Sequence, residues 1–271
     1  MSLKIKVEDR IPTYPGRVVL TPVAGAENTF DMTRADLPVN PGTPINKVLF
    51  DSKADRVTED VTVYVSQNGS DITGTGENLN PFKTIQAAID SIPKSLDGNT
   101  VIVDIGNGEY DENVVCRGFT GGKLVIGVLG RICTISGLEV DSCSFVEVNL
   151  YEIKHGTVSP NTALLNVTGG SVVSVPRDIM IDGGYNNISG VQASLGSTVC
   201  FGYGFELSVA YCNTAAVVST SGSRISLSTV TGGYNSFGLT ATMGGTITHG
   251  LNTLDSSFGD NEQDGGRIFS N

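Results

Sequence analysis

The sequence predicts an all-β protein whose main part is a single-stranded right-handed parallel β-helix of about seven coils. Three observations predict this fold class. Glycine is abundant, at 34 of 271 residues, tryptophan is absent and charged residues make up only 17% of the chain, which favours many tight turns between short strands. Short apolar runs recur at near-constant intervals from residue 98 onward. One amphipathic helix precedes the first of these runs.

Residues 1–60 are predicted to form an irregular, proline-rich arm. The only regular signal in this segment is a short β-like run from Arg17 to Thr21. Six of the ten prolines of the chain lie here: Pro12, Pro15, Pro22, Pro38, Pro41 and Pro44. A segment of this composition cannot build a hydrophobic core alone. We therefore expect the arm to lie along another surface or to be ordered by a partner.

Residues 61–97 contain a predicted strand and a predicted capping helix. The run VTVYV at 61–65 alternates and is rich in β-branched residues, as in a strand. The helix is expected over 81–92, with Asn80 as its N-cap and Pro93 ending it. Its apolar residues fall on one stripe and are Phe82, Ile85, Ile89 and Ile92. Such a helix would cover the open end of a β-helix, whose unpaired backbone groups otherwise invite aggregation.

Residues 98–250 repeat, with a turn-like group of small polar residues before each apolar residue that opens a strand. These opening residues are Val101, Leu124, Phe145, Val172, Val199, Ile225 and Ile247, at spacings of 21 to 27 residues. The strand phase near Phe145 and Val172 is ambiguous. The repeats hold short β-runs and no helical pattern, so each fits one coil of a parallel β-helix. The polar segment 251–271 is expected to cover the other end or to join a neighbouring subunit.

The composition excludes several functional classes. The net charge of −11 repels nucleic acid and anionic membranes, so neither is expected as a partner. No apolar run reaches the roughly 20 residues of a membrane span, and the start MSLKIKVEDR lacks the apolar region of a signal peptide. We expect no metal and no cofactor. The cysteines form no CxxC pair and are interpreted as small buried residues: Cys116, Cys133, Cys143, Cys200 and Cys212.

The stretch YVSQNGSDITGTGENLNPFKTIQAAID at 64–90 resembles the N-terminal cap of pectin-lyase-like β-helix proteins. The YVS opening, the NG and GTG turns and NPFKTIQAAID carry the resemblance. It implies the fold of the cap and of the coils to about residue 250. It does not imply an activity, because this fold serves lyases, hydrolases and non-enzymatic adhesins alike.

The stretch at 9–50 resembles the N-terminal segment of tail or baseplate proteins of phages and prophages of Gram-positive bacteria. PTYPGRVVLTPV, FDMTRAD and GTPINK carry this resemblance. It implies an arm that attaches to other tail or baseplate proteins, in a protein assembled in the bacterial cytoplasm and located in the virion tail. Fibre-like proteins of this kind are commonly homotrimers, so we expect a homo-oligomer, with a trimer favoured. The alternative is an arm that packs on the β-helix of its own chain.

One cluster of charged residues could carry catalysis. Asp178 and Asp182 lie four residues apart, Glu206 follows in the next coil, and Arg177 adds a positive charge. Glycosidases need two carboxyl groups about 5–5.5 or 6.5–9.5 Å apart, and equivalent positions on stacked coils lie about 4.8 Å apart. The more ordinary interpretation is that these side chains are solvated at coil edges. We therefore favour a structural over an enzymatic role.

Three tyrosines mark a second repeat in step with the first. Tyr185, Tyr211 and Tyr234 open the runs YNNISGVQAS, YCNTAAVVST and YNSFGLTATM. Aligned in successive coils, they could stack on the sugar rings of a ligand or on one another, and we favour mutual stacking. The neighbouring asparagines fit turn positions that tolerate a left-handed backbone: Asn186, Asn187, Asn213 and Asn235.

Three functional hypotheses follow. The first is a phage tail-associated structural protein, with an attachment arm and a β-helix that serves as shaft or as a head binding a host surface glycan. The second is a polysaccharide-degrading hydrolase or lyase on the same fold. The third is a non-catalytic carbohydrate-binding adhesin. The sequence does not distinguish host, receptor or ligand.

Overall fold

The computed structural model describes residues 18–22, 30–34, 56–158 and 162–270. The chain divides into an N-terminal unit, Leu3–Ala54, and a second unit that begins at Asp55. The described part of the first unit is an antiparallel pair of strands, β1 (Val18–Pro22) and β2 (Phe30–Arg34). Strand β1 corresponds to the predicted β-like run, whereas β2 was not predicted. Residues 56–60 of the predicted arm belong instead to the second unit, where Val57 is buried in the core, and the other parts of the arm lie outside the described residues.

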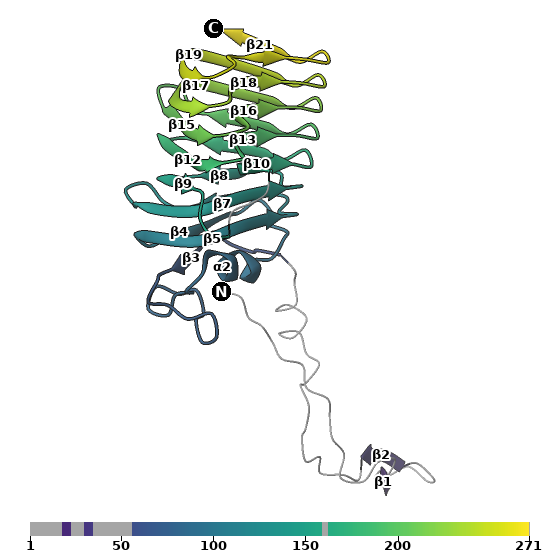
Figure 1. Cartoon of the computed structure of the whole chain (residues 1–271). Helices are drawn as coiled ribbons and strands as arrows, with labels where there is room; N and C mark the ends of the chain where they lie inside the picture. The colour runs from purple at the N-terminus through teal and green to yellow at the C-terminus, as the bar shows by residue number, and fades with distance from the viewer. Residues whose placement is uncertain (1–17, 23–29, 35–55, 159–161, 271) are drawn as a thin grey trace. The chain divides into compact units, whose positions relative to one another are not determined.

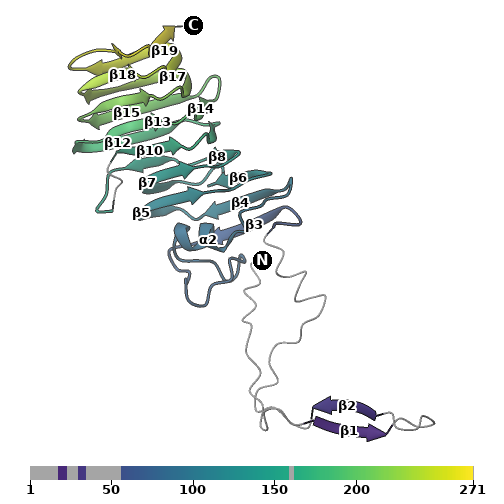
Figure 2. The ribbon, with the colours of Figure 1, turned by 90° about the vertical axis from the view of Figure 1, so that its right-hand side faces the viewer.

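The second unit is a parallel β-helix of about seven turns, as predicted. Its strands form one continuous set of parallel ladders in which each coil pairs with the coil before and after it (Figures 1 and 2). Three faces, which we call face 1, face 2 and face 3, run along the β-helix. Because each strand pairs with the equivalent strand of the next coil, residues far apart in sequence become neighbours in space, from 18 positions apart for Thr134 and Glu152 to 40 for Val61 and Val101.

The three faces contain the following strands. Face 1 consists of β3 (Val61–Val65), β4 (Thr100–Ile105), β6 (Lys123–Ile126), β8 (Val146–Val148), β11 (Val172–Val175), β14 (Thr198–Phe201), the first parts of β17 (Arg224–Asn235) and β19 (Thr246–Ser256), and β21 (Arg267–Ser270). Face 2 consists of the first parts of β5 (Gly108–Arg117) and β7 (Cys133–Asp141), then β9 (Glu152–Lys154), β12 (Ile179–Asn186), β15 (Glu206–Cys212) and the second parts of β17 and β19. Face 3 consists of the second parts of β5 and β7, then β10 (Ala163–Thr168), β13 (Ser189–Ala193), β16 (Ala215–Ser219), β18 (Phe237–Ala241) and β20 (Asn261–Glu262).

The predicted column of apolar residues exists, with two corrections of phase. The stacked residues of face 1 are Val101, Leu124, Val146, Val173, Val199, Ile225, Ile247 and Ile268. Val146 and Val173 therefore replace the predicted Phe145 and Val172. Both predicted residues have an apolar neighbour one position on, and a shift of one residue moves a side chain to the other face of a strand. Val146 and Val173 are fully buried, whereas Phe145 and Val172 are partly exposed.

The predicted capping helix is α2 (Ile85–Ser91), and its N-cap is Thr84, so the prediction of Asn80 was wrong. The Thr84 hydroxyl accepts a hydrogen bond from the Ala87 amide at 3.2 Å. The segment before Thr84 is extended, because Phe82 pairs with Val65 of β3. The helix ends before Pro93, as predicted, since the residue that precedes a proline favours extended backbone.

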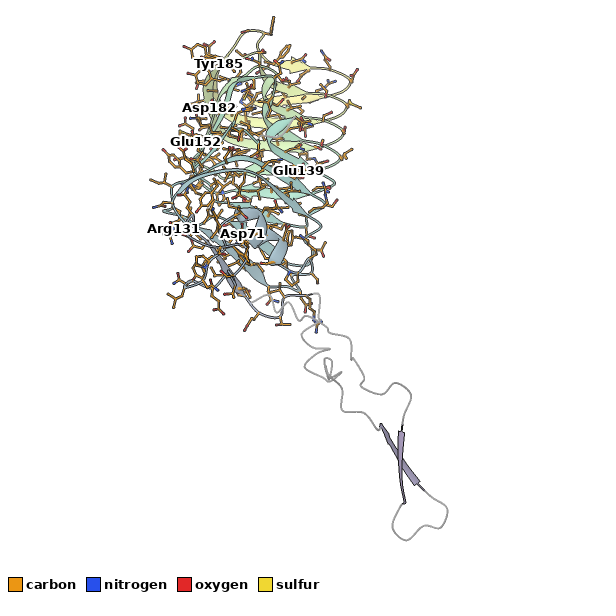
Figure 3. All side chains as sticks on the ribbon, turned by 60° about the horizontal axis from the view of Figure 1, so that its bottom comes forward. Asp71, Arg131, Glu139, Glu152, Asp182 and Tyr185 are labelled. Atoms are coloured by element: carbon orange, nitrogen blue, oxygen red, sulfur yellow. The ribbon has the colours of Figure 1, made fainter. Side chains whose placement is uncertain are left out.

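Two carboxylates from distant segments hold the start of α2. Asp71 lies near α2 (Figure 3). Its Oδ1 accepts the amides of Lys83 and Thr84 at 2.8 and 2.9 Å. Glu112 of β5 accepts the amides of Ile85 and Gln86, both at 3.0 Å. These contacts place carboxylates at the positive end of a short helix and fix it over the first coil.

Residues 251–270, which we expected to cover the end or to join a subunit, continue the β-helix as the end of β19, β20 and β21. All five cysteines are free; four are buried and Cys200 is exposed on face 1, so the expectation of burial was wrong for that residue. Among the described residues, no helix has the length and apolar character of a membrane span.

Candidate functional site

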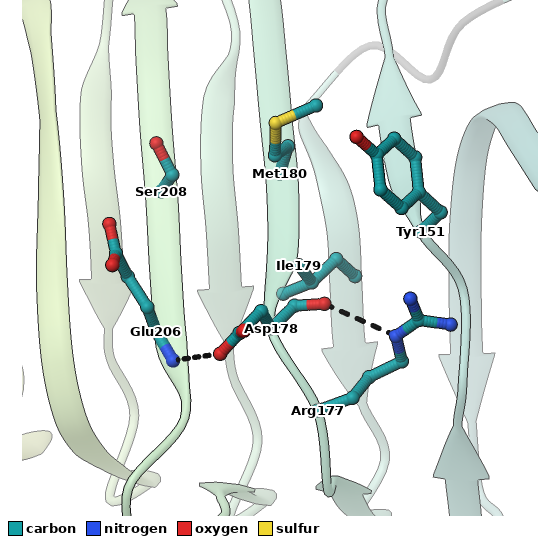
Figure 4. A pocket seen from close by; sticks show the side chains of 7 residues that line it. All are labelled: Tyr151, Arg177, Asp178, Ile179, Met180, Glu206 and Ser208. Carbon is teal, nitrogen blue, oxygen red and sulfur yellow. Dashed lines mark hydrogen bonds between the residues drawn. The ribbon is translucent and has the colours of Figure 1, made fainter. Parts of the chain in front are cut away.

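A shallow depression of about 380 Å³ lies on face 2, where β12 and β15 run side by side (Figure 4). It combines residues from three coils, because β12 pairs with β9 on one side and with β15 on the other. The lining residues are Tyr151, Arg177, Asp178, Ile179, Met180, Glu206 and Ser208. Three of the four residues predicted as a catalytic cluster therefore meet here.

Asp178 and Glu206 occupy adjacent coils, and each carboxylate already has a partner in the protein. Asp178 Oδ1 accepts the backbone amide of Glu206 at 2.7 Å (Figure 4). Glu206 Oε1 accepts the hydroxyl of Thr231, one coil further on. Both residues are exposed. One oxygen of each carboxylate is thus used to tie coils together, while the exposed side chains remain accessible to a ligand.

Arg177 is fixed by backbone carbonyls. Its Nε donates to Asp178 O at 3.3 Å, and its Nη1 donates to Asn149 O at 3.1 Å and to Arg131 O at 3.5 Å. None of the ion pairs between described residues involves Arg177. The guanidinium lies 6.0 Å from the centre of the Tyr151 ring. A cation without a paired carboxylate is thereby held at the edge of the depression.

Four lining residues were not predicted: Tyr151, Ile179, Met180 and Ser208. Tyr151 and Met180 are exposed apolar side chains, and Ser208 is the register partner of Met180 in the next coil. Strand alternation could have identified Met180, because it lies between the inward-facing Ile179 and Ile181. Tyr151 has no repeat signal, since the coils before and after it differ in length. Tyr151 and Met180 together give the depression an apolar wall opposite its charged residues (Figure 4).

Asp182 lies on β12 but does not line the depression. Four residues of strand separate it from Asp178, which is about 13 Å along the chain. Its register partners are Lys154 and Ala210, and its Oδ1 accepts the Gly184 amide at 2.9 Å in the turn before Tyr185 (Figure 3). The geometry thus brings Asp178 and Glu206 together and leaves Asp182 apart.

The three predicted tyrosines stack on one another at the corner between face 2 and face 3. Ring centres are 4.4 Å apart for Tyr185 and Tyr211, and 5.1 Å apart for Tyr211 and Tyr234. Partial desolvation, with the neighbouring Tyr211, raises the pKa of the Tyr185 hydroxyl. Tyr211 lies between the other two rings, stacked on Tyr234 at 12° and tilted by 45° against Tyr185, so the rings contact one another, while Tyr185 and Tyr234 remain 62% and 67% exposed.

The left-handed residues at this corner are the tyrosines themselves, at φ of about 60°, and the prediction that the asparagines occupy these positions was wrong. The asparagines instead bind backbone groups. Asn213 Nδ2 donates to Tyr185 O at 2.5 Å. The buried Asn235 accepts the Cys212 amide at 3.0 Å and donates to Val209 O at 2.9 Å. These contacts stabilise the turns in which Tyr185 and Tyr211 lie.

The described residues contain no cluster of three or more histidine, cysteine or carboxylate side chains that could hold a metal ion. The groups that line the depression are two carboxylates, one guanidinium, two hydroxyls and the apolar side chains of Ile179 and Met180. Comparison with known proteins finds no matching family model, no matching curated protein and no matching solved structure.

Proposed function

We propose that this protein is a tail-associated structural component of a phage or prophage particle. Residues 1–60 attach it to other tail or baseplate proteins, and the β-helix serves as a shaft or as a head that contacts host surface polysaccharide. The observation that carries the proposal is the division of the chain at Asp55 into two units. The segment that resembles tail proteins, 9–50, falls within one unit and the β-helix forms the other.

The β-helix has the properties that a shaft or head requires. One hydrophobic core runs without interruption from Val57 and α2 to Ile247, with contributions from every coil. Each coil is stabilised by pairing with its neighbours, so the unit resists local bending. The protein would be assembled in the cytoplasm of the host bacterium and reside in the virion tail.

The depression on face 2 supports a contact with a glycan. Tyr151 and Met180 provide an apolar wall on which the apolar side of a sugar ring can lie. Asp178, Glu206 and Arg177 place acceptors and donors beside it for sugar hydroxyls. A surface with few, fixed polar groups around an apolar wall is typical of ligand sites.

The attachment role is tested by deleting residues 1–50 and measuring incorporation of the protein into particles. We expect incorporation to be lost while the circular dichroism of the β-helix is retained. Unchanged incorporation would contradict the attachment role.

The glycan contact is tested separately, by titrating host cell-wall polysaccharide into the Tyr151→Ala variant. Weaker binding than in the unchanged protein is expected, and Asp182→Ala, outside the depression, is the matched control.

A polysaccharide hydrolase or lyase is the second candidate, because Asp178 and Glu206 face one depression from adjacent coils. Incubation with host capsule or teichoic-acid preparations, followed by measurement of chain length, distinguishes the two functions. Shortened chains that disappear in Glu206→Gln would establish an enzyme. Binding without shortening supports the structural role.

A further inference from the structure

A lysine, a glutamate and an asparagine from two neighbouring coils meet on face 1, and none of them lines the depression. Lys123 is the first residue of β6, and Glu147 lies in β8, the strand that pairs with β6 in the next coil. Lys123 Nζ donates to Glu147 Oε2 at 3.0 Å, and Asn149 Nδ2 donates to Glu147 Oε1 at 3.0 Å. One carboxylate therefore holds an amine from one coil and a side-chain amide from the next.

This cluster is partly shielded from water. Asn149 is 4% exposed, and the side chains of Glu147 and Lys123 are 22% and 39% exposed. Val125, the register partner of Glu147, points outward between the inward-facing residues of β6, yet it is only 5% exposed. An apolar side chain thus lies on the same side of the strands as the three polar ones, and it helps to keep water from them.

The Asn149 amide is held through its nitrogen alone. Its Oδ1 is buried, and no described residue donates a hydrogen bond to that oxygen. Arg177 Nη1 donates to the backbone carbonyl of Asn149 at 3.1 Å, so a positive charge lies beside this residue. A positive charge favours the negative charge that develops on an amide oxygen when its carbon is attacked.

We propose that Lys123 and Asn149 are joined by an intramolecular isopeptide bond, and that Glu147 is the acid–base group that forms it. A lysine amine is a nucleophile once it has lost a proton, and a general base must lie within about 2.6–3.2 Å of the group that it deprotonates. Glu147 meets this condition for Lys123 and contacts the leaving nitrogen with its other oxygen.

The reaction balances without an oxidant, a reductant or a cofactor. Glu147 takes one proton from the Lys123 ammonium group, and Nζ attacks Cγ of Asn149. The Nζ–Cγ bond forms and the Cγ–Nδ2 bond breaks. The leaving nitrogen takes one proton from Nζ and one from Glu147, and it departs as an ammonium ion. Glu147 is thereby restored as a carboxylate, and the four-carbon stem of Lys123 supplies the flexibility that the approach to Cγ requires.

The bond would tie two successive coils of the β-helix together covalently. It closes a loop from residue 123 to residue 149, and a covalent link of this kind stabilises a fold by restricting its unfolded chain. The inference does not depend on the proposed function, because it rests on three side chains of face 1 alone. It assigns a modification site to the β-helix, whatever the protein attaches to.

Mass spectrometry of the full chain tests the bond directly. The intact mass of the folded protein is expected to be lower than the sequence mass by one ammonia. Trypsin cuts after lysine and arginine, and it should fail to cut after the modified Lys123. Peptide 118–131 should therefore remain joined to peptide 132–154, which contains Asn149. A full sequence mass, with the two peptides separate, would overturn the inference.

Two variants separate this bond from other losses of ammonia. Lys123→Arg keeps the positive charge and removes the nucleophile, whereas Glu147→Gln keeps the shape and removes the base. Both are expected to have their full sequence mass, with circular dichroism confirming that they fold. Lys154→Arg, on face 2, is the matched control and should retain the ammonia loss.

Ammonia loss that persists in Lys123→Arg would show cyclisation of an asparagine with its own backbone, and would overturn the inference. Persistence of the joined peptides in Glu147→Gln would contradict the role of Glu147. If Glu147→Gln does not fold, Lys123→Arg, which can retain the ion pair with Glu147, still decides whether Lys123 forms the bond.

Discussion

Tyr185, Tyr211 and Tyr234 adopt a left-handed backbone that costs most residues about 1–2 kcal/mol. The cost is offset locally, because the rings stack on one another and the Asn213 side chain binds the Tyr185 carbonyl. Stacking of this kind contributes about 0.5–1.5 kcal/mol for each pair. Contacts within the tyrosine ladder thus stabilise the strained turns of successive coils.

Two substitutions of Tyr211 separate the ring contacts from the backbone strain. Tyr211→Asn keeps a residue that tolerates a left-handed backbone and loses two ring contacts, so we expect the free energy of unfolding to fall by about 1–3 kcal/mol. Tyr211→Val loses the same contacts and adds the strain of a β-branched residue, so it should fall further. Urea unfolding measures both, and equal losses would show that the backbone strain is unimportant.

At the scale of elements, α2 shows how a short helix is fixed at one end of the repeat. Seven residues are too few for a stable isolated helix. Its stability comes from the buried residues Ile85, Ala88 and Ile89 and from the cap at Thr84.

Thr84→Ala removes the hydroxyl that accepts the Ala87 amide, and we expect a loss of about 0.5–2 kcal/mol in the free energy of unfolding. Thr84→Ser, which retains the hydroxyl, should restore most of it.

The contact of Asp71 with α2 predicts a dependence on pH. Burial opposes ionisation of Asp71, but hydrogen bonds from Thr84 and Lys83 outweigh it and lower its pKa below the ordinary value of 3.8. A carboxyl group with a lowered pKa stabilises the fold above its ordinary pKa, and this stabilisation is lost as pH falls through the folded pKa. The difference in melting temperature between the unchanged protein and Asp71→Asn should therefore shrink below about pH 3.8. A constant difference down to pH 2 would contradict this assignment.

Glu112 binds the same end of α2, but its pKa is raised, whereas that of Asp71 is lowered. Burial raises its pKa, because the folded protein disfavours the charged form even though the Gln86 and Ile85 amides partly compensate. A raised carboxyl pKa makes the folded state bind protons more readily, so this group favours folding more at acid pH than above its folded pKa. Glu112→Gln removes that contribution, and its effect on melting temperature should change as pH rises above about 4.5.

At the scale of the whole molecule, each coil is a layer that its neighbours complete. Residue 189 and residue 215 occupy equivalent positions, since Val191 pairs with Val217. Deleting 189–214 therefore removes one whole coil and joins equivalent points. We expect a folded, shorter β-helix with unchanged β-sheet circular dichroism per residue. Deleting only 189–201 breaks the register and should prevent folding; equal behaviour of the two deletions would contradict the coil model.

The fold could be predicted from sequence to the extent that local patterns repeat. The apolar periodicity predicted the coils and the column of apolar residues that stacks along face 1. Pro93 predicted the end of α2. The phase at Val146 and Val173 could not be predicted, because each has an apolar neighbour and only burial distinguishes them. Thr84 was missed as the N-cap because the pairing of Phe82 with β3 is a tertiary contact.

The candidate site was predictable in part for the same reason. The spacing of the coils along the sequence is enough to predict that Arg177, Asp178 and Glu206 lie close together. Tyr151 lies outside the repeat pattern, and its place beside Arg177 depends on a coil of different length. The sequence also suggested Asp182, which strand geometry places too far along β12. The separation of two residues along one strand therefore predicts less well whether their side chains meet than does their occupying equivalent positions in neighbouring coils.

The stacking of coils in register is the claim on which both proposals depend, and a disulfide tests it directly. Ser174 and the exposed Cys200 face outward from neighbouring strands and are register partners. Parallel neighbours lie about 4.8 Å apart, within the range that a disulfide spans. Val172→Cys, two residues out of register with Cys200, is the control at roughly 8 Å. After mild oxidation we predict an intrachain disulfide to Cys200 in Ser174→Cys and none in Val172→Cys; no disulfide in the first, or equal yields in both, would contradict the register.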